Sequence, residues 1–195
     1  FNLNTKRALV ETGGEMEWVS GTFGSKVTML YPTTILKGEG AKMEYLGMSL
    51  ASGEQILDSG AKAICLADNT SAIIRSKSVS KNGGVSMTKT LAKVGKGIKG
   101  VKAYIDCKSL ILDSESRSYA EPMVDVNSGE AEVTHEASVG KLSEEILYYL
   151  ATRGIGEEKA KEILIRGFSE EITKALPLEY AMEMNNLIKL EMQNM

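Results

Sequence analysis

Apolar and polar residues alternate with a period of two through most of the first 140 residues. Such runs are typical of strands, because successive side chains of a strand point to opposite faces. The runs lie at 26–36, 42–50, 61–66, 72–79, 85–94, 101–112, 122–126 and 131–139. Clusters of Gly, Asn, Asp and Ser separate them, and no segment between them fits a crossover helix. The pattern therefore predicts a mainly β region.

Two architectures bury strands without helices, and the alternation alone does not choose between them. One is a sandwich or barrel, and the other is a solenoid that stacks strands in parallel coils. Gly-Ala-Lys occurs at 40–42 and again at 60–62, followed each time by an apolar run. We interpret this recurrence as a faint coil repeat, which favours a β-solenoid.

The period of the pattern changes near residue 141. Ser143 is a suitable N-cap for a first helix, and Gly167 is expected to end a second one. The expected helices cover 144–152, 157–166, 170–175 and a segment that opens at Pro177. Helices this short bury little core by themselves, so they are expected to pack on the sheet region, on each other or on a partner. We thus expect a β core domain over 1–140 and a small helical domain over 141–195.

Composition and charge narrow the classes of protein. Of the 195 residues, 43% are hydrophobic, and the net charge is -3. The slightly negative net charge argues against a protein that binds nucleic acid through an overall positive charge. No apolar run approaches the roughly 20 residues of a membrane span. Two cysteines and a start at Phe1 without a secretion leader favour a reducing, cytoplasmic setting and a chain cut from something longer. The basic run from Arg75 to Lys102 lacks interleaved aromatics, so we interpret it as solvated surface.

Motifs of common catalytic sites are absent from the sequence, but three residues are candidate metal ligands. Cys107 lies in the run 101–112, where a lone cysteine is most often a small buried hydrophobe. His135 and Glu136 are adjacent in a strand, so they point to opposite faces unless a bend or a second subunit intervenes. A thiolate, an imidazole and a carboxylate are nevertheless reasonable ligands for iron or zinc.

Six segments resemble the SufB/SufD family of iron-sulfur cluster assembly scaffolds, in the family's order along the chain. They are NTKRALV (4–10), GSKVTMLYP (24–32), DSGAKAICLADNTSAIIRSKSVSKNGG (58–84), DCKSLILD (106–113), THEASVGKLSEEILYYLATRGI (134–155) and IRGFSEEITKALPLEYAMEMNNLIKLEM (165–192). The resemblance implies a right-handed parallel β-helix followed by a C-terminal helical domain, acting as a scaffold and not as an enzyme. It implies three partners: the SufC ATPase on the helical domain, a SufD-like chain or a second copy at the end of the β-helix, and a cysteine desulfurase system.

The resemblance also implies roles for individual residues. Cys107 and Glu136 fall on SufB positions proposed to hold a nascent iron-sulfur cluster, and His135 falls on a position where SufD offers a histidine. A symmetric dimer would supply two of each, so that one strand can serve sites on both sides of the interface. Lys6 matches a lysine associated with an interior route for sulfur. The residues expected to contact SufC are Arg153, Gly154, Ile155, Arg166, Gly167 and Phe168.

Two other functions remain open at this point. The chain could be an enzyme built on a β-solenoid, such as a polysaccharide lyase or a hexapeptide-type acyltransferase, although strict six-residue repeats are absent. It could also be a SufD-like structural partner that docks the ATPase while Cys107 stays inert.

Overall fold

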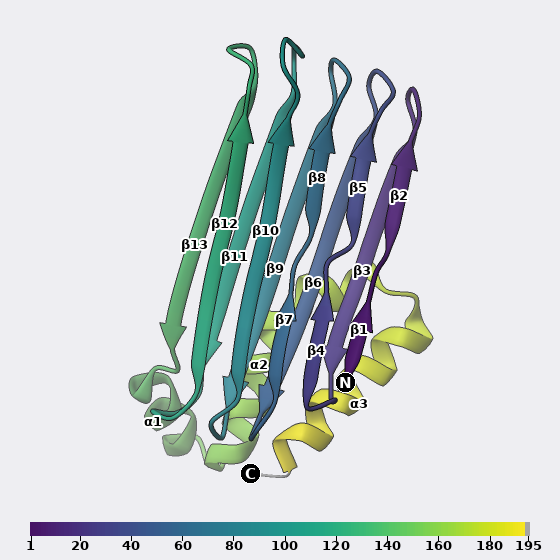
Figure 1. Cartoon of the computed structure of the whole chain (residues 1–195). Helices are drawn as coiled ribbons and strands as arrows, with labels where there is room; N and C mark the ends of the chain where they lie inside the picture. The colour runs from purple at the N-terminus through teal and green to yellow at the C-terminus, as the bar shows by residue number, and fades with distance from the viewer. Residues whose placement is uncertain (194–195) are drawn as a thin grey trace.

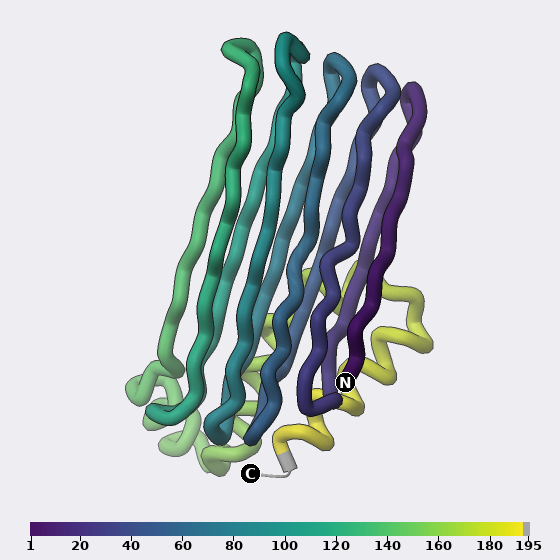
Figure 2. Tube along the Cα trace, viewed as in Figure 1, coloured from purple at the N-terminus to yellow at the C-terminus, as the bar shows by residue number. Residues whose placement is uncertain are grey.

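The computed structural model describes residues 1–193 and shows stacked parallel coils with helices against one side (Figures 1 and 2). Sheet A, in front in Figure 1, has eight strands, and sheet B, behind it, has five. The strands of sheet A are β1 (Asn2–Asn4), β2 (Arg7–Val10), β4 (Val27–Leu30), β5 (Thr33–Leu36), β7 (Ile56–Ser59), β8 (Lys62–Cys65), β10 (Val85–Val94) and β12 (Arg117–Val126). The strands of sheet B are β3 (Glu15–Phe23), β6 (Lys42–Ser52), β9 (Ser71–Lys81), β11 (Lys102–Ile111) and β13 (Glu132–Lys141). The expected parallel β-solenoid is confirmed, with one sheet B strand in each of five coils.

The coils repeat with a spacing that the sequence does not display. Lys42 of β6 pairs with Ser71 of β9, which pairs with Lys102 of β11, at spacings of 71 − 42 = 29 and 102 − 71 = 31 residues. The two Gly-Ala-Lys segments lie at the starts of β6 and β8, which belong to different sheets. They are therefore not successive copies of one coil, and that interpretation of the sequence was wrong although the solenoid itself is right.

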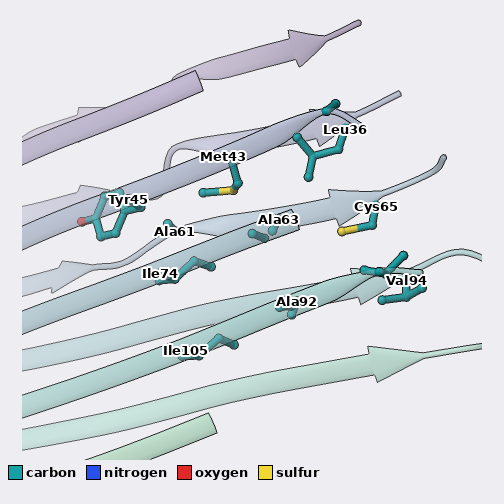
Figure 3. Close-up of a cluster of buried hydrophobic side chains, with 14 of the residues drawn as sticks. Leu36, Met43, Tyr45, Ala61, Ala63, Cys65, Ile74, Ala92, Val94 and Ile105 are labelled. Carbon is teal, nitrogen blue, oxygen red and sulfur yellow. The ribbon is translucent and has the colours of Figure 1, made fainter. Parts of the chain in front are cut away.

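Inward-pointing side chains fill the space between the two sheets (Figure 3). Leu36, Ile74 and Ile105 are fully buried there, and Tyr45 is almost so. Burial of each large aliphatic side chain contributes about 1.5–3 kcal/mol relative to exposure. The hydrophobic half of the interior therefore holds the two sheets together.

The half of the interior nearer the helices is lined by serine hydroxyls. Ser78 Oγ lies 2.8 Å from Ser109 Oγ in sheet B, and Ser86 Oγ donates to Ser118 Oγ at 3.0 Å in sheet A. Ser80 Oγ lies 2.8 Å from Ser86 Oγ and so joins the sheets. Because a buried hydroxyl without a partner destabilises a fold, this mutual pairing lets small polar residues occupy the interior.

Neighbouring coils approach closely at their turns. A Cβ atom at Gly38 would lie 1.9 Å from the amide nitrogen of Thr12 in the preceding coil. The amide of Gly38 donates to the carbonyl of Val10 at 3.1 Å, which fixes this spacing. At Gly129, in the last coil, a Cβ atom would meet nothing within 4 Å. Glycine is thus required at position 38 and dispensable at position 129.

A carboxylate holds the turn between β11 and β12. Asp113 accepts hydrogen bonds from the amides of Glu115 at 2.9 Å, Ser116 at 2.7 Å and Asn82 at 2.5 Å. Burial alone would raise the pKa of Asp113, but the hydrogen bonds from Ser116, Asn82 and Glu115 outweigh it and hold the pKa below its usual value. The ionised carboxylate therefore stabilises this turn.

Within residues 1–193, three helices follow the solenoid, where four were expected. They are α1 (Glu144–Thr152), α2 (Glu157–Ala175) and α3 (Leu178–Gln193). Ser143 caps α1 as expected, because its hydroxyl accepts from the amide of Ile146. The expected stop at Gly167 was wrong, since α2 runs through it without interruption. A glycine inside a helix costs only about 1 kcal/mol, and burial of Ile165 and Ile172 on either side outweighs that cost.

Helices α2 and α3 cover the outer face of sheet B over its lower half in Figure 1. This second core consists of Leu46, Met48, Leu50, Val79, Ile165, Ile172, Met184, Ile188 and Met192. Lys81 is fully buried beside it, and its ammonium group donates to the carbonyl of Glu191 near the end of α3. Burial lowers the pKa of Lys81. None of the helices in residues 1–193 is long and apolar enough to cross a membrane.

The basic run from Arg75 to Lys102 pairs with acids of neighbouring coils. Lys89 Nζ lies 3.1 Å from Asp58 Oδ2, and Lys93 Nζ lies 2.9 Å from Asp125 Oδ2. Asp58 is buried in the first pair, whereas the second pair is half-exposed and, like other solvated pairs, contributes little stability.

Candidate functional site

The solenoid ends in an open coil formed by β12 and β13. Among the described residues, β12 pairs only with β10 and β13 only with β11, so each strand has one free edge. Val124 is 50% exposed and Val139 is 53% exposed on these strands. A free edge with exposed apolar side chains favours pairing with another strand. In the described part of the chain the first coil also has free edges, at β1, β2 and β3, so the last coil is one of two ends of the solenoid suited to contact another chain.

Cys107 lies on β11, one strand in from that edge. Its register neighbours are Ser76 of β9 and Ala137 of β13, and only 1% of its surface is exposed. Burial raises the pKa of the Cys107 thiol to about 11, a rise that the nearby Thr90 hydroxyl partly opposes and the charge of Asp106 increases. The thiol is thus protonated near pH 7, and a metal that binds it must displace the proton.

His135 and Glu136 lie on opposite faces of β13, as the sequence predicted. His135 pairs in register with Ile105, which is buried between the sheets, so the histidine shares the inward face with Cys107. Residues offset by two positions on neighbouring strands are about 7–8 Å apart, which is the relation between Cys107 and His135. Glu136 pairs with Asp106 on the outer face.

One chain by itself does not assemble these ligands around an ion. Within residues 1–193, no group of three or more His, Cys, Asp or Glu side chains is placed to hold a metal. Cys107 is buried on the inward face, His135 lies on the same face of the last strand but is exposed, and Glu136 is exposed on the outer face. A second copy at the free edge is the arrangement in which groups from both faces could meet.

Lys6 lies in the first coil, exposed between β1 and β2, whereas Cys107 lies in the fourth. With coils about 4.8 Å apart, three steps correspond to roughly 14 Å. The inward row that leads to Cys107 consists of Ser20, Gly47 and Ser76. The hydroxyl of Tyr45 fills the space beside Gly47, where a Cβ atom would lie only 2.2 Å away from it. The row itself therefore consists of small side chains, while the buried Tyr45 side chain occupies the space beside Gly47.

The turn between α1 and α2 carries the first set of residues expected to contact SufC. Gly154 has a φ of 78° and donates its amide to the carbonyl of Ala151, which ends α1. Arg153 is exposed and stacks on Tyr149, with 5.3 Å between the guanidinium carbon and the ring centroid. Ile155 is half-buried. Of these three residues, Arg153 and Gly154 are therefore accessible on the surface.

The second set of residues expected to contact SufC lies in the middle of α2. Its members lie in two different environments. Arg166 is half-buried and bonded to Glu162 at 2.9 Å, and Gly167 is exposed. Phe168 packs against the core between α2 and sheet B, with Lys77 Nζ 5.5 Å from its ring centroid. Phe168 thus has an internal packing role in this chain.

Two exposed aromatic residues on α1 were missed by the sequence reasoning. Tyr148 is 74% exposed and Tyr149 is 57% exposed. Adjacent tyrosines in an otherwise amphipathic helix are a signal that the sequence contained, because both cannot face the same core. Exposed tyrosines are enriched at protein interfaces.

Comparison with known proteins places this architecture in a family. The model of the family described as "SUF system FeS cluster assembly, SufBD core domain" matches residues 1–168. The chain belongs to the SufBD family. Proteins of Staphylococcus epidermidis and Staphylococcus aureus, both named iron-sulfur cluster assembly SufBD family protein, are 50% identical to it over 193 residues. That similarity covers 99% of this chain and 42% of each relative, so the chain spans about two-fifths of their length.

Membership in the SufBD family confirms the resemblance stated from the sequence and associates the chain with the SUF system of iron-sulfur cluster assembly. The donor types near the end of the solenoid fit that association. A thiol, an imidazole and a carboxylate lie on the last two strands of sheet B, and all three are established kinds of iron ligand.

Proposed function

We propose that this SufBD chain is a scaffold component of the SUF system that holds a nascent iron-sulfur cluster at a dimer interface and docks the SufC ATPase. One observation carries the proposal: Cys107, His135 and Glu136 all lie on β11 and β13, the two strands at one edge of sheet B. A two-fold pairing of β13 with a second copy, or with a SufD-like chain, would bring both sets of ligands together.

In this proposal the protein is an assembly scaffold without turnover of its own. Cys107 binds iron as a thiolate after losing its proton to solvent, and Glu136 and His135 supply oxygen and nitrogen ligands. Sulfur comes from a cysteine desulfurase system, with Lys6 at the start of the interior route. The small side chains of Ser20, Gly47 and Ser76, which form the row beside Tyr45 that leads to Cys107, support such a route.

The helices form the docking face for SufC in the same proposal. The exposed turn at Arg153 and Gly154 supports this, together with the exposed Tyr148 and Tyr149 beside it. Arg166 and Gly167 extend the surface along α2. Phe168 contributes indirectly, because it packs between α2 and sheet B and so holds α2 in place.

A second candidate is a SufD-like partner that docks the ATPase without binding a cluster. The buried thiol of Cys107 favours it, because a pKa of about 11 makes the thiolate rare at neutral pH. The two candidates differ in whether Cys107 has a chemical role.

Anaerobic reconstitution with ferrous iron and sulfide separates the candidates. The scaffold should gain visible absorption and bound iron, and Cys107→Ser should lose both. Cys65→Ser is a matched control, because Cys65 is also buried but lies in sheet A away from the free edge. Equal iron in the parent and Cys107→Ser would remove Cys107 from the proposal, and no iron in either would support the SufD-like candidate.

A further inference from the structure

One buried hydroxyl in the interior of the solenoid has no partner. Thr90 lies on the inward face of β10 and is fully buried, and its Oγ1 atom has no hydrogen-bond partner among the described residues. The serine hydroxyls nearer the helices are paired, as between Ser86 Oγ and Ser118 Oγ at 3.0 Å. Because a buried hydroxyl without a partner destabilises a fold, its presence at Thr90 calls for an explanation.

Thr90 faces Cys107 across the interior. Cys107 lies on the inward face of β11 in sheet B, whereas β10 belongs to sheet A. Packed sheets lie about 10 Å apart, so the inward side chains of both sheets meet between them. Burial raises the pKa of Cys107, and the Thr90 hydroxyl is close enough to the sulfur to oppose that rise. The unpartnered hydroxyl therefore lies beside the thiol that the proposed function uses.

The neutral and charged forms of the sulfur differ in what they offer this hydroxyl. A neutral thiol is a weak acceptor, so the hydroxyl of Thr90 stays without a partner beside it. A thiolate is negatively charged, and hydrogen bonds to a charged acceptor are roughly twice as strong as those between neutral groups. The Thr90 hydroxyl thus gains a good acceptor only when Cys107 has lost its proton.

The neighbours of this pair in the last coil offer no competing donor. Thr90 pairs in register with Pro122 of β12, and Cys107 pairs with Ala137 of β13. Neither proline nor alanine has a side-chain group that donates a hydrogen bond. The other register neighbour of Cys107 is Ser76, which carries a hydroxyl and is the alternative donor that a test must exclude.

We infer that Thr90 is a positioning residue for Cys107, and that its hydroxyl donates a hydrogen bond to the sulfur once a metal has replaced the thiol proton. The proton of the thiol passes to solvent, while Thr90 keeps its own proton. A donor on sheet A leaves the side of Cys107 toward Ala137 and the end of the solenoid for the metal. The natural ligand of Cys107 rests on the proposed function, whereas the hydrogen bond is testable with another metal.

The test is binding of Cd²⁺ without iron or sulfide. Cadmium is a soft ion that binds thiolates, and these complexes absorb in the ultraviolet. All proteins carry Cys65→Ser, so that Cys107 is the one thiol in the sequence. Because loss of an indirect metal partner weakens affinity by about 10–100-fold, Thr90→Val should bind Cd²⁺ at least about tenfold more weakly. Thr90→Ala should show the same loss, and Thr90→Ser, which keeps the hydroxyl, should bind as the parent does.

Stability separates this positioning role from a structural one. Because the hydroxyl has no partner in the metal-free chain, Thr90→Val should unfold at the same urea concentration as the parent or at a higher one. A hydroxyl with a structural role would lower that concentration when removed. Two controls remove other buried hydroxyls and should leave Cd²⁺ affinity unchanged. They are Thr88→Val, on the same inward face of β10, and Ser76→Ala.

Three results would overturn the inference. They are the absence of cadmium-thiolate absorption in the parent, equal Cd²⁺ affinity in Thr90→Val and the parent, and weakened binding that Thr90→Ser does not restore. Failure of the proposed function is a separate result. Cd²⁺ binding that depends on Thr90, together with cluster retention by Cys107→Ser after iron and sulfide are added, would support the inference and reject the cluster site.

Discussion

Raising the pH from 7 to 10 should weaken the fold through Cys107. Burial raises the pKa of this thiol from 9.0 to about 11 in the folded chain, whereas the unfolded chain keeps the ordinary value. Between these values the unfolded state binds fewer protons than the folded state, so the free energy of unfolding falls as the pH rises. Below pH 9 both states hold the proton, and the effect vanishes.

The magnitude follows from the two pKa values. At pH 10 the unfolded thiol is mostly ionised and the folded thiol mostly neutral, which lowers the free energy of unfolding by about 1.4 kcal/mol. Urea unfolding at pH 7 and pH 10, followed by fluorescence of the single tryptophan, Trp18, measures this loss. Cys107→Ser should lack it, because serine does not titrate in this range. The pH dependence of other groups is common to both proteins and cancels in the comparison.

A matched control is Ser76→Ala, which alters the register neighbour of Cys107 on β9 and keeps the thiol. It should retain the full pH-dependent loss. If the parent and Cys107→Ser lose the same stability between pH 7 and pH 10, the thiol is not buried with a raised pKa, and the argument from its environment is refuted.

Four further variants test the packing that positions the site. Gly38→Ala should lower the free energy of unfolding by about 3 kcal/mol in urea, because its Cβ atom meets backbone of the preceding coil, while Gly129→Ala should change it by less than about 0.5 kcal/mol. Lys81→Ala should raise amide hydrogen exchange in α3 by an amount equivalent to about 2 kcal/mol, and unchanged exchange would contradict the role of the buried ammonium group. Asp113→Ala should cost about 2 kcal/mol at pH 7. Because the folded pKa of Asp113 is lowered, that difference should shrink as the pH falls below the ordinary value of 3.8, and a constant difference would contradict it.

Alternation in the sequence was sufficient to predict the faces of the candidate site. In the run 101–112 it placed Cys107 opposite Asp106, and adjacency in a strand placed His135 opposite Glu136. The start of β12 was missed because its inward positions at Ser118 and Ala120 are small or polar, so the strand lacks a hydrophobic alternation. The serine network makes such residues acceptable in the interior, and that network exists only in three dimensions.

Other features depend on contacts that sequence rules cannot supply. Glycine is a common helix terminator, yet Gly167 lies within α2 because its flanking residues pack on sheet B. One carboxylate oxygen of Asp106 has no partner, because its register neighbour Arg75 binds acids on β6 and α2, which are far away in sequence. The residue types were visible in the sequence, but their partners were not.

Native mass spectrometry of the anaerobically reconstituted protein tests the shared cluster site most directly, because it reports the number of chains and the bound iron and sulfide in each species. Cluster mass should be carried by dimers, of two copies or of one copy with a SufD-like chain, and should disappear from dimers of Cys107→Ser. A cluster carried by the monomer, or retained by dimers of Cys107→Ser, would contradict it.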